Sequence, residues 1–178
     1  TGGFSVSGVY PELTLIDDIN VKTGRFLNQN DVTDKRKVAI IGLGVVETLF
    51  AKDENPIGEY ISINGVYFQV IGTTVPTSSG GRGEEQRNEV HIPFSTFQQA
   101  FNYGDIVGWY AVMASKNISA SVAEEKTLAI LRERHKVSPD DANAIGHWNM
   151  ETEFKKMSGL FSGISGLVWI VGIGTLLA

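Results

Sequence analysis

The segment 40–47, IIGLGVVE, is the part of the chain most like a nucleotide-binding motif. A strand, a turn containing Gly42 and Gly44, and the start of a helix could hold a pyrophosphate at the helix N-terminus. However, Glu47 stands where the third glycine of that fingerprint belongs, and its negative charge would oppose a phosphate. The next strand carries Asn64 and Gly65 instead of an acidic residue for a ribose. We therefore interpret the glycines as a tight strand-to-helix turn and expect no cofactor.

The other side chains that could do chemistry are dispersed along the chain. Three histidines lack the spacing of metal ligands, so no metal site is expected; they are His91, His135 and His147. Four pairs of acidic residues are adjacent in sequence, and such neighbours diverge on a helix or strand; they are Asp17/Asp18, Glu84/Glu85, Glu124/Glu125 and Asp140/Asp141. They suit solvated faces and helix caps. We predict no catalytic residue and a chain that is not itself an enzyme.

The elements around these positions follow from the spacing of apolar residues. The clearest unit is a hairpin formed by residues 60–63 and 66–72, because Asn64-Gly65 between alternating runs is a strong turn signal. Further strands are expected at 4–9, 19–22, 37–41, 89–93, 107–115 and 144–148, with a turn at 23–25. Helices are expected at 12–20, 45–50, 96–101 (capped by Ser95) and 119–136. The closing β-α-β order predicts an α+β fold with helices against a sheet.

Residues 77–88, TSSGGRGEEQRN, are rich in glycine, serine and charge, which predicts an exposed and mobile loop. Exposed loops often carry binding residues. The loop is therefore a candidate contact surface for a partner, through Ser78, Ser79, Arg82, Glu84, Glu85 and Arg87. An ordinary solvent loop is an equally good interpretation of the same composition.

The last twenty residues, 159–178, carry no charge and directly follow a polar helical stretch at 151–156. About 20 apolar residues cross a bilayer as a helix, and glycine is more frequent in membrane helices than in soluble ones. We predict a soluble domain joined to a membrane helix that is cut short in this sequence. A buried core helix, or an apolar tail packed on its own domain, is the alternative. A helix running unbroken through Met150, Phe154 and Lys156 would be a stiff stalk between the domain and the membrane.

The composition excludes some classes of function. The net charge of -5 and the absence of a basic stripe argue against binding to nucleic acid. Lys155 and Lys156 are too few for a polybasic lipid site. The chain contains no cysteine, which suits an oxidising compartment in which no disulfide is used.

An ordered set of short motifs resembles the periplasmic domain of the MacB-type ABC transporter permeases. The motifs are TGRF at 23–26, VAIIG at 38–42, NPIG at 55–58 after Leu49-Phe50, ISI at 61–63, FQVIG at 68–72, IPF at 92–94 and LRERH at 131–135. The closing residues 167–178 are similar to the start of that family's second membrane helix. The resemblance covers nearly the whole chain.

This resemblance implies that the chain is a two-lobed extracytoplasmic domain. The whole protein would lie in the bacterial inner membrane, with this domain in the periplasm. A porter-like β-α-β lobe would comprise residues 1–20 and 90–150, with its N-terminal part missing. A sabre-like mixed α/β lobe would comprise residues 21–89. Residues 151–178 would be the stalk and the start of the membrane helix.

The resemblance also implies partners and a mechanism. ATP would be hydrolysed in a separate or fused ABC ATPase, and the hydrolysis would be coupled to movement of the periplasmic domain for efflux or extraction of a substrate. A periplasmic adaptor, an outer-membrane channel and a second permease subunit, as a homodimer or heterodimer, are possible partners. The alternative function is a membrane-anchored sensor or regulatory binding domain of the FtsX type, without transport.

Overall fold

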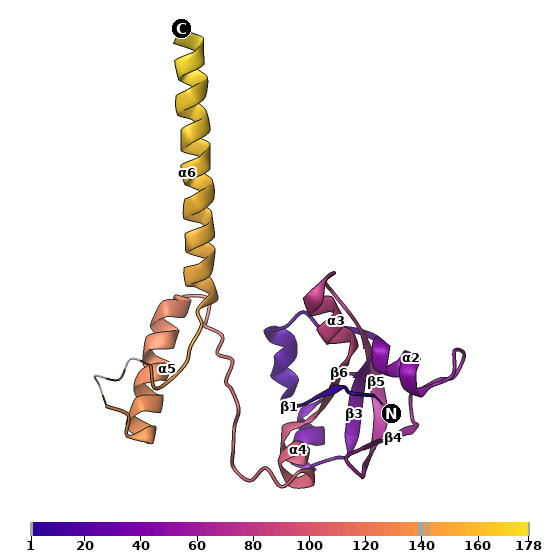
Figure 1. The fold of residues 1–178 in the computed structure, drawn as a ribbon. Coiled ribbons are helices and arrows are strands. Elements are labelled where there is room, and N and C mark those ends of the chain that lie inside the picture. Colours follow the sequence, from indigo (N-terminus) through magenta and orange to yellow (C-terminus); the bar gives the residue numbers. More distant parts are fainter. Residues whose placement is uncertain (1, 139–140, 142, 178) are drawn as a thin grey trace. The chain divides into compact units, whose positions relative to one another are not determined.

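Figure 1 shows the computed structural model, which describes residues 2–138, 141 and 143–177. The chain divides into two compact units, Thr1–Trp109 (unit 1) and Tyr110–Ala178 (unit 2). Strands and helices occur together, so the predicted α+β class is confirmed. Asp140, from one of the acidic pairs, and Ala178, the last residue of the predicted stalk segment, lie outside the described residues.

Unit 1 is built on a mixed six-stranded sheet. The strand order along the sheet is β1 (Ser5–Val9), β6 (Glu89–Pro93), β3 (Val38–Gly42), β5 (Val66–Val75) and β2 (Asn20–Gly24), and β4 (Tyr60–Ile63) also pairs with β5. The pairs β1–β6 and β3–β5 are parallel, whereas the other pairs are antiparallel. The sheet therefore joins strands from both segments that the sequence assigned to different lobes.

The β4–β5 hairpin is confirmed. Ile63 pairs with Val66, and the two residues between them have positive φ angles, 48° at Asn64 and 83° at Gly65. Such angles at both central positions are those of a type I′ turn, whose twist matches the strands that it joins. The turn chemistry thus sets the register of the longest strand in the sheet.

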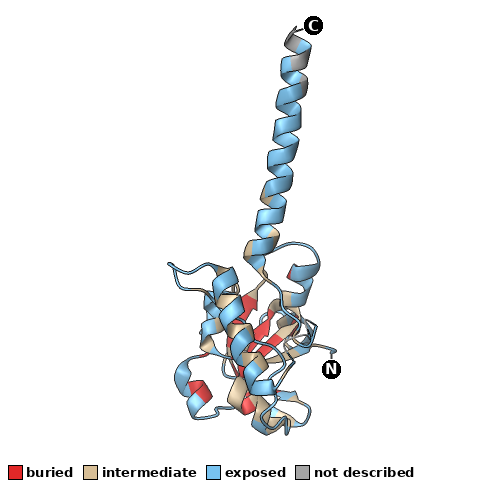
Figure 2. Cartoon of the chain, turned by 90° about the vertical axis from the view of Figure 1, so that its left-hand side faces the viewer, coloured by how far each residue is buried: buried red, intermediate tan, exposed pale blue. Residues whose placement is uncertain are grey.

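Apolar side chains cover both faces of the sheet. On one face Ile41, Phe68 and Ile92 are fully buried beneath α2 (Leu43–Leu49) and α4 (Phe94–Ala100). On the other face Ile40 packs with Val9, Leu27 and Val38 and with Leu13 of the 3-10 helix η1 (Pro11–Leu15). Burial on both faces explains why β3 reads as a continuous apolar run. Figure 2 shows the buried residues gathered in these strands.

The helix expected at 12–20 is wrong beyond the short 3-10 helix η1, which ends at Leu15. Three further local predictions in unit 1 are wrong. The predicted loop contains a helix, α3 (Gly81–Arg87). The helix expected at 96–101 begins at Phe94, and Ser95 donates its hydroxyl hydrogen bond to the Val32 carbonyl instead of capping. The turn expected at 23–25 lies in β2 up to Gly24, because pairing with β5 holds that residue in the sheet. Tertiary contacts decide each of these cases over local composition. The short helix α1 (Gln29–Thr33) completes the unit.

Unit 2 contains two helices, α5 (Ala120–His135) and α6 (Met150–Leu177). Ser119 caps α5 through the Val122 amide, as the predicted start of that helix requires. The strands predicted at 107–115 and 144–148 are wrong, since the described residues there form no strand. An alternating segment becomes a strand only when a neighbour accepts its backbone hydrogen bonds, and neither segment is paired with another described strand.

The helix α6 runs without interruption over 28 residues. No helix in the described part of the chain combines the length and the apolar character that a membrane crossing needs. The predicted membrane helix is therefore not confirmed.

Candidate functional site

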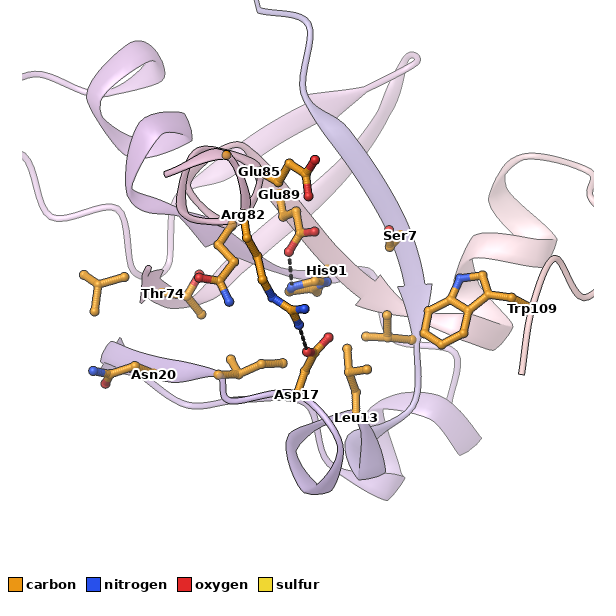
Figure 3. A pocket seen from close by; sticks show the side chains of 15 residues that line it. Ser7, Leu13, Asp17, Asn20, Thr74, Arg82, Glu85, Glu89, His91 and Trp109 are labelled. Carbon is orange, nitrogen blue, oxygen red and sulfur yellow. Dashed lines mark hydrogen bonds and ion pairs between the residues drawn. The ribbon is translucent and has the colours of Figure 1, made fainter. Parts of the chain in front are cut away.

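A cavity of unit 1 with a volume of about 600 Å³ lies on the sheet face that carries Val9. Val9, Leu13 and Ile19 are among its apolar lining residues, and α3 contributes Arg82 and Glu85 to the polar part. Figure 3 shows Arg82 reaching from α3 toward Asp17, with which it forms an ion pair. The cavity thus combines an aliphatic floor with charged groups at its rim.

Ion pairs connect both ends of α3 to other parts of unit 1. Arg82 pairs with Asp17 at its start. At its end Arg87 Nη2 lies 2.6 Å from Glu47 Oε2 of α2, and its Nε lies 3.9 Å from Glu84 Oε1. Of the predicted contact residues, the two arginines are therefore engaged within unit 1. Ser78, Ser79, Glu84 and Glu85 are exposed, and Glu85 also lines the cavity.

The packing of α3 explains the Gly-x-Gly spacing at the end of β3. A Cβ at Gly42 would lie 2.3 Å from the Arg87 carbonyl oxygen, and a Cβ at Gly44 would lie 2.6 Å from the Asn88 Oδ1. Only glycine allows this approach of two backbones. The motif serves the junction of β3, α2 and α3, which is the structural role that the sequence predicted for it.

His91 is the residue of the cavity that sequence reasoning missed. It is buried, its Nε2 lies 3.4 Å from Glu89 Oε2, and its ring meets the edge of Phe26. The hydrogen bond with His91 lowers the pKa of Glu89, and the charge of Arg82 acts in the same direction. Among the described residues, His91 Nδ1 is buried without a hydrogen-bond partner. The alternation of Glu89 and His91 along one strand was the available signal.

A second polar cluster of unit 1 is structural. Asp31 is fully buried and receives Arg25 Nη1 at 2.6 Å, Arg25 Nη2 at 3.0 Å and the Asn28 amide at 2.9 Å. The Asn28 side chain in turn accepts from the Asp31 amide, which completes a capping box at the start of α1. The TGRF motif thus supplies the guanidinium that neutralises a buried carboxylate.

In unit 2 a polar joint connects the first turns of the two helices. Asn149 Oδ1 caps α6 by accepting from the Glu151 amide at 2.9 Å and the Thr152 amide at 3.3 Å. Its Nδ2 donates to Glu124 Oε2 of α5 at 2.7 Å. In the opposite direction, Glu151 Oε2 accepts from the Ser121 amide of α5 at 3.3 Å. An amide in the first turn of α5 is therefore satisfied by Glu151 of α6. An amide in the first turn of α6 is satisfied by Asn149, which directly precedes that helix.

Other charged groups surround this joint. His147 Nε2 lies 3.5 Å from Glu124 Oε1. Hydrogen bonds from Lys155 and from the Ser121 amide lower the pKa of Glu151. Of the predicted stalk residues, Met150 and Phe154 are exposed, and Lys156 Nζ lies 2.8 Å from Glu153 Oε1. The sequence located the helix but not Asn149, whose role needs the position of α5.

The described residues contain no group of three or more histidine, aspartate or glutamate side chains that could hold a metal ion. Of the remaining histidines, His135 occupies the last turn of α5, where a positive charge suits the helix dipole. His91 lies in unit 1, whereas His135 and His147 lie in unit 2.

Comparison with known proteins gives consistent matches. Residues 1–131 match the family described as the MacB-like periplasmic core domain. The macrolide export ATP-binding/permease protein MacB of Chlorobaculum tepidum is 32% identical over 136 residues, which is 75% of this chain and 20% of that protein. The pyoverdine export ATP-binding/permease protein PvdT of Pseudomonas putida is 28% identical over 157 residues, 84% of this chain and 24% of that protein. The chain spans about a fifth of the length of the curated relatives that it matches.

Two solved structures show the same fold. The periplasmic region of MacB from Actinobacillus actinomycetemcomitans has a TM-score of 0.64 at 21% identity, with 86% of this chain and 64% of that chain covered. The extracellular domain of the noncanonic ABC-type transporter YknZ from Gram-positive bacteria has a TM-score of 0.59 at 20% identity, with 75% and 65% covered.

Proposed function

We propose that this chain, which belongs to the MacB-like periplasmic core domain family, transmits ATP-driven movement of an ABC exporter permease to the periplasmic side of the membrane. The chain itself would catalyse no reaction, and ATP hydrolysis would take place in a separate or fused ATPase domain. The porter-like and sabre-like lobes at 1–20 with 90–150 and at 21–89 stay part of this proposal. So do a periplasmic adaptor, an outer-membrane channel and a second permease subunit as partners.

The observation that carries the proposal is the continuity of α6 from the polar joint into its uncharged part. A helix of 28 residues is about 42 Å long. Its first turns are reinforced by the pairs Glu151–Lys155 and Glu153–Lys156, and no charged residue follows Lys156. A continuous helix moves as a rigid element. Displacement at the uncharged end, which the proposal assigns to the membrane side, is therefore delivered to the joint with α5.

The test is an insertion in the full-length protein directly after Lys156. A seven-residue Gly-Ser insertion makes the stalk flexible, whereas a seven-residue Ala-rich insertion adds about two helical turns and keeps it stiff. Two readouts are needed: ATP hydrolysis by the purified protein, and efflux-dependent resistance of cells to a macrolide and to other toxic compounds. We expect the flexible insertion to abolish resistance and leave ATP hydrolysis in place, and the helical insertion to retain most of the resistance.

Normal efflux with the flexible insertion would contradict the proposal. An unchanged phenotype when the whole gene is deleted, together with co-purification of a cell-wall hydrolase and no export partner, would favour the sensor of the FtsX type instead.

A further inference from the structure

We propose that the cavity of unit 1 is a binding site for an amphipathic organic amine, a small molecule with a positively charged nitrogen on an apolar body. Its volume of about 600 Å³ lies within the usual range of small-molecule sites. The inference concerns binding by unit 1 and does not rest on the proposed transport role.

The apolar body of the ligand would lie on aliphatic and aromatic side chains. Val9 and Leu13 belong to the core on this face of the sheet, and Val75 extends the lining at the end of β5. Trp109, which is 66% exposed, also lines the cavity, and Figure 3 labels it beside β1. An indole at the rim can stack on an apolar ligand or face its cation. The lining thus favours a molecule with substantial apolar surface.

The charges that line the cavity determine whether it favours a cationic or an anionic ligand. Asp17, Glu85 and Glu89 line it together with one guanidinium, that of Arg82, so the lining has a net charge of -2 when His91 is neutral. Arg82 is committed to Asp17, and Glu89 lies against His91. Glu85 has no ion-pair partner among the described residues. A negative rim over an apolar floor repels phosphates and carboxylates and attracts amines.

Uncommitted hydrogen-bonding groups complete the site. Within the described part of the chain, the side chains of Ser7, Asn20 and Thr74 line the cavity and hydrogen-bond to no other residue. An amine with a nearby hydroxyl or carbonyl group would satisfy these side chains.

The Arg82–Asp17 pair competes with the ligand. Both side chains are well exposed, at 64% and 39%, and exposed ion pairs contribute little to stability. An incoming ammonium can therefore replace the guanidinium beside Asp17 without disrupting the sheet. Removing the positive charge of Arg82, although this residue lines the cavity, should therefore raise the affinity for the amine.

The first experiment compares three probes of the same shape on the whole 178-residue chain. 2-Phenylethylamine is the cation, 2-phenylethanol its neutral analogue and phenylacetate its anionic analogue. Binding is followed at low ionic strength by NMR, through the Trp109 indole N–H and the backbone amides of β6. A probe this small should bind at about the millimolar level. We expect saturable shifts for the amine, at least about tenfold weaker binding for the alcohol, and none for the anion.

Variants then test the assignment to this cavity. Glu85→Gln should weaken amine binding about fivefold, because the unpaired carboxylate is lost. Glu84→Gln is the matched control, since Glu84 is adjacent on α3 and 73% exposed but does not line the cavity. Arg82→Gln should tighten binding about threefold. The unchanged amide spectrum of β3 and β5 would show that each variant is folded.

Several outcomes would overturn the proposal. Equal affinities for the amine and the alcohol would remove the electrostatic selection, and equal losses for Glu84→Gln and Glu85→Gln would show only a general attraction to an acidic protein. Shifts confined to residues outside the cavity, weaker binding by Arg82→Gln, or no saturable shift up to about 20 mM amine would each reject the site.

Discussion

Different interactions stabilise the interior of each compact unit. In unit 1 both faces of the sheet are covered, and Ile40, Ile41, Phe68 and Ile92 are completely inaccessible to solvent. In unit 2 no residue of α5 is buried, and Ile130 on that helix is 63% exposed. The described contacts between α5 and α6 centre on the polar joint around Asn149.

This difference shows where each kind of change should act. Apolar burial of many residues gives unit 1 a cooperative core. An unpaired buried charge or an added methyl group there should lower the free energy of unfolding strongly. Isolated helices in water are marginal, and capping contributes a large part of their stability. A few hydrogen bonds should therefore determine the arrangement of unit 2. The predictions below test this contrast, beginning with the largest expected effect.

Asp31→Asn should produce the largest loss, about 3 kcal/mol of the free energy of unfolding. The carboxylate is fully buried and neutralised by Arg25, so the variant leaves a guanidinium without its partner. Asp34→Asn is the control, because Asp34 pairs with Arg36 at 2.8 Å on the surface and should contribute less than about 1 kcal/mol. Urea unfolding followed by circular dichroism measures both. Equal effects of the two variants would contradict a special role for burial.

The same residue predicts a pH dependence. Burial alone would raise the pKa of Asp31, but hydrogen bonds from Arg25 and the Asn28 amide, with the charges of Arg25 and Arg36, outweigh it and lower the pKa. A lowered folded-state pKa stabilises the protein above the unfolded value of about 3.9 and loses that contribution as pH falls through the folded value. The difference in the free energy of unfolding between the natural chain and Asp31→Asn should therefore decrease only below about pH 4.

Gly42→Ala and Gly163→Ala should have opposite effects. A Cβ at Gly42 would lie 2.3 Å from one backbone carbonyl oxygen and 2.6 Å from another, which cannot rotate away, so we expect a loss of about 2 kcal/mol. A Cβ at Gly163 in α6 meets nothing within 4 Å, and alanine should stabilise the helix by about 0.5 to 1 kcal/mol. Thermal unfolding and helix content by circular dichroism provide the comparison. A neutral Gly42→Ala would show that α3 packs less tightly than described.

The same contrast explains what the sequence could predict. The hairpin at Asn64-Gly65 and the buried strand β3 were found because local turn chemistry and apolar pattern agree with the sheet around them. The segment 107–115 is also rich in apolar and aromatic residues, but a strand there needs a pairing neighbour, which no pattern within the segment supplies. The helix α3 was missed because its glycine-rich composition favours a loop, whereas its backbone packs tightly against the end of β3, where Gly42 leaves room for the Arg87 carbonyl oxygen.

The candidate sites were harder to predict for the same reason. Glu85 and Arg82 were selected as surface residues of a loop, and their place in a cavity depends on strands that lie far away in sequence. His91 was considered alone, without Glu89, although both point to one face of β6. Asn149 is of a residue type that caps helices, but its contact with Glu124 spans 25 residues and has no local signal. Sequence patterns identified the elements but not which side chains they bring together.

The last prediction concerns the joint in unit 2. Asn149→Asp keeps an oxygen that can cap α6, since asparagine and aspartate are equally good N-caps. It removes the Nδ2 donor and places a negative charge against Glu124, so we expect a loss of about 1 kcal/mol in the α5–α6 interaction. Adding Glu124→Gln should restore the contact, because the new amide can donate to the new carboxylate. Asn149→Ala loses both the cap and the contact and should not be rescued by Glu124→Gln.

The decisive measurement is the distance distribution between spin labels at the exposed positions Glu125 of α5 and Phe161 of α6. It should be narrow in the natural chain, broad in Asn149→Asp and narrow again in the double variant, while helix content stays constant. If the polar joint determines the arrangement of unit 2, a change of charge at Asn149 must alter the distance distribution even though both helices remain formed. A distribution that is equally narrow in all three proteins would show that contacts other than these hydrogen bonds orient α6, and the contrast with the apolar core of unit 1 would then lose its basis.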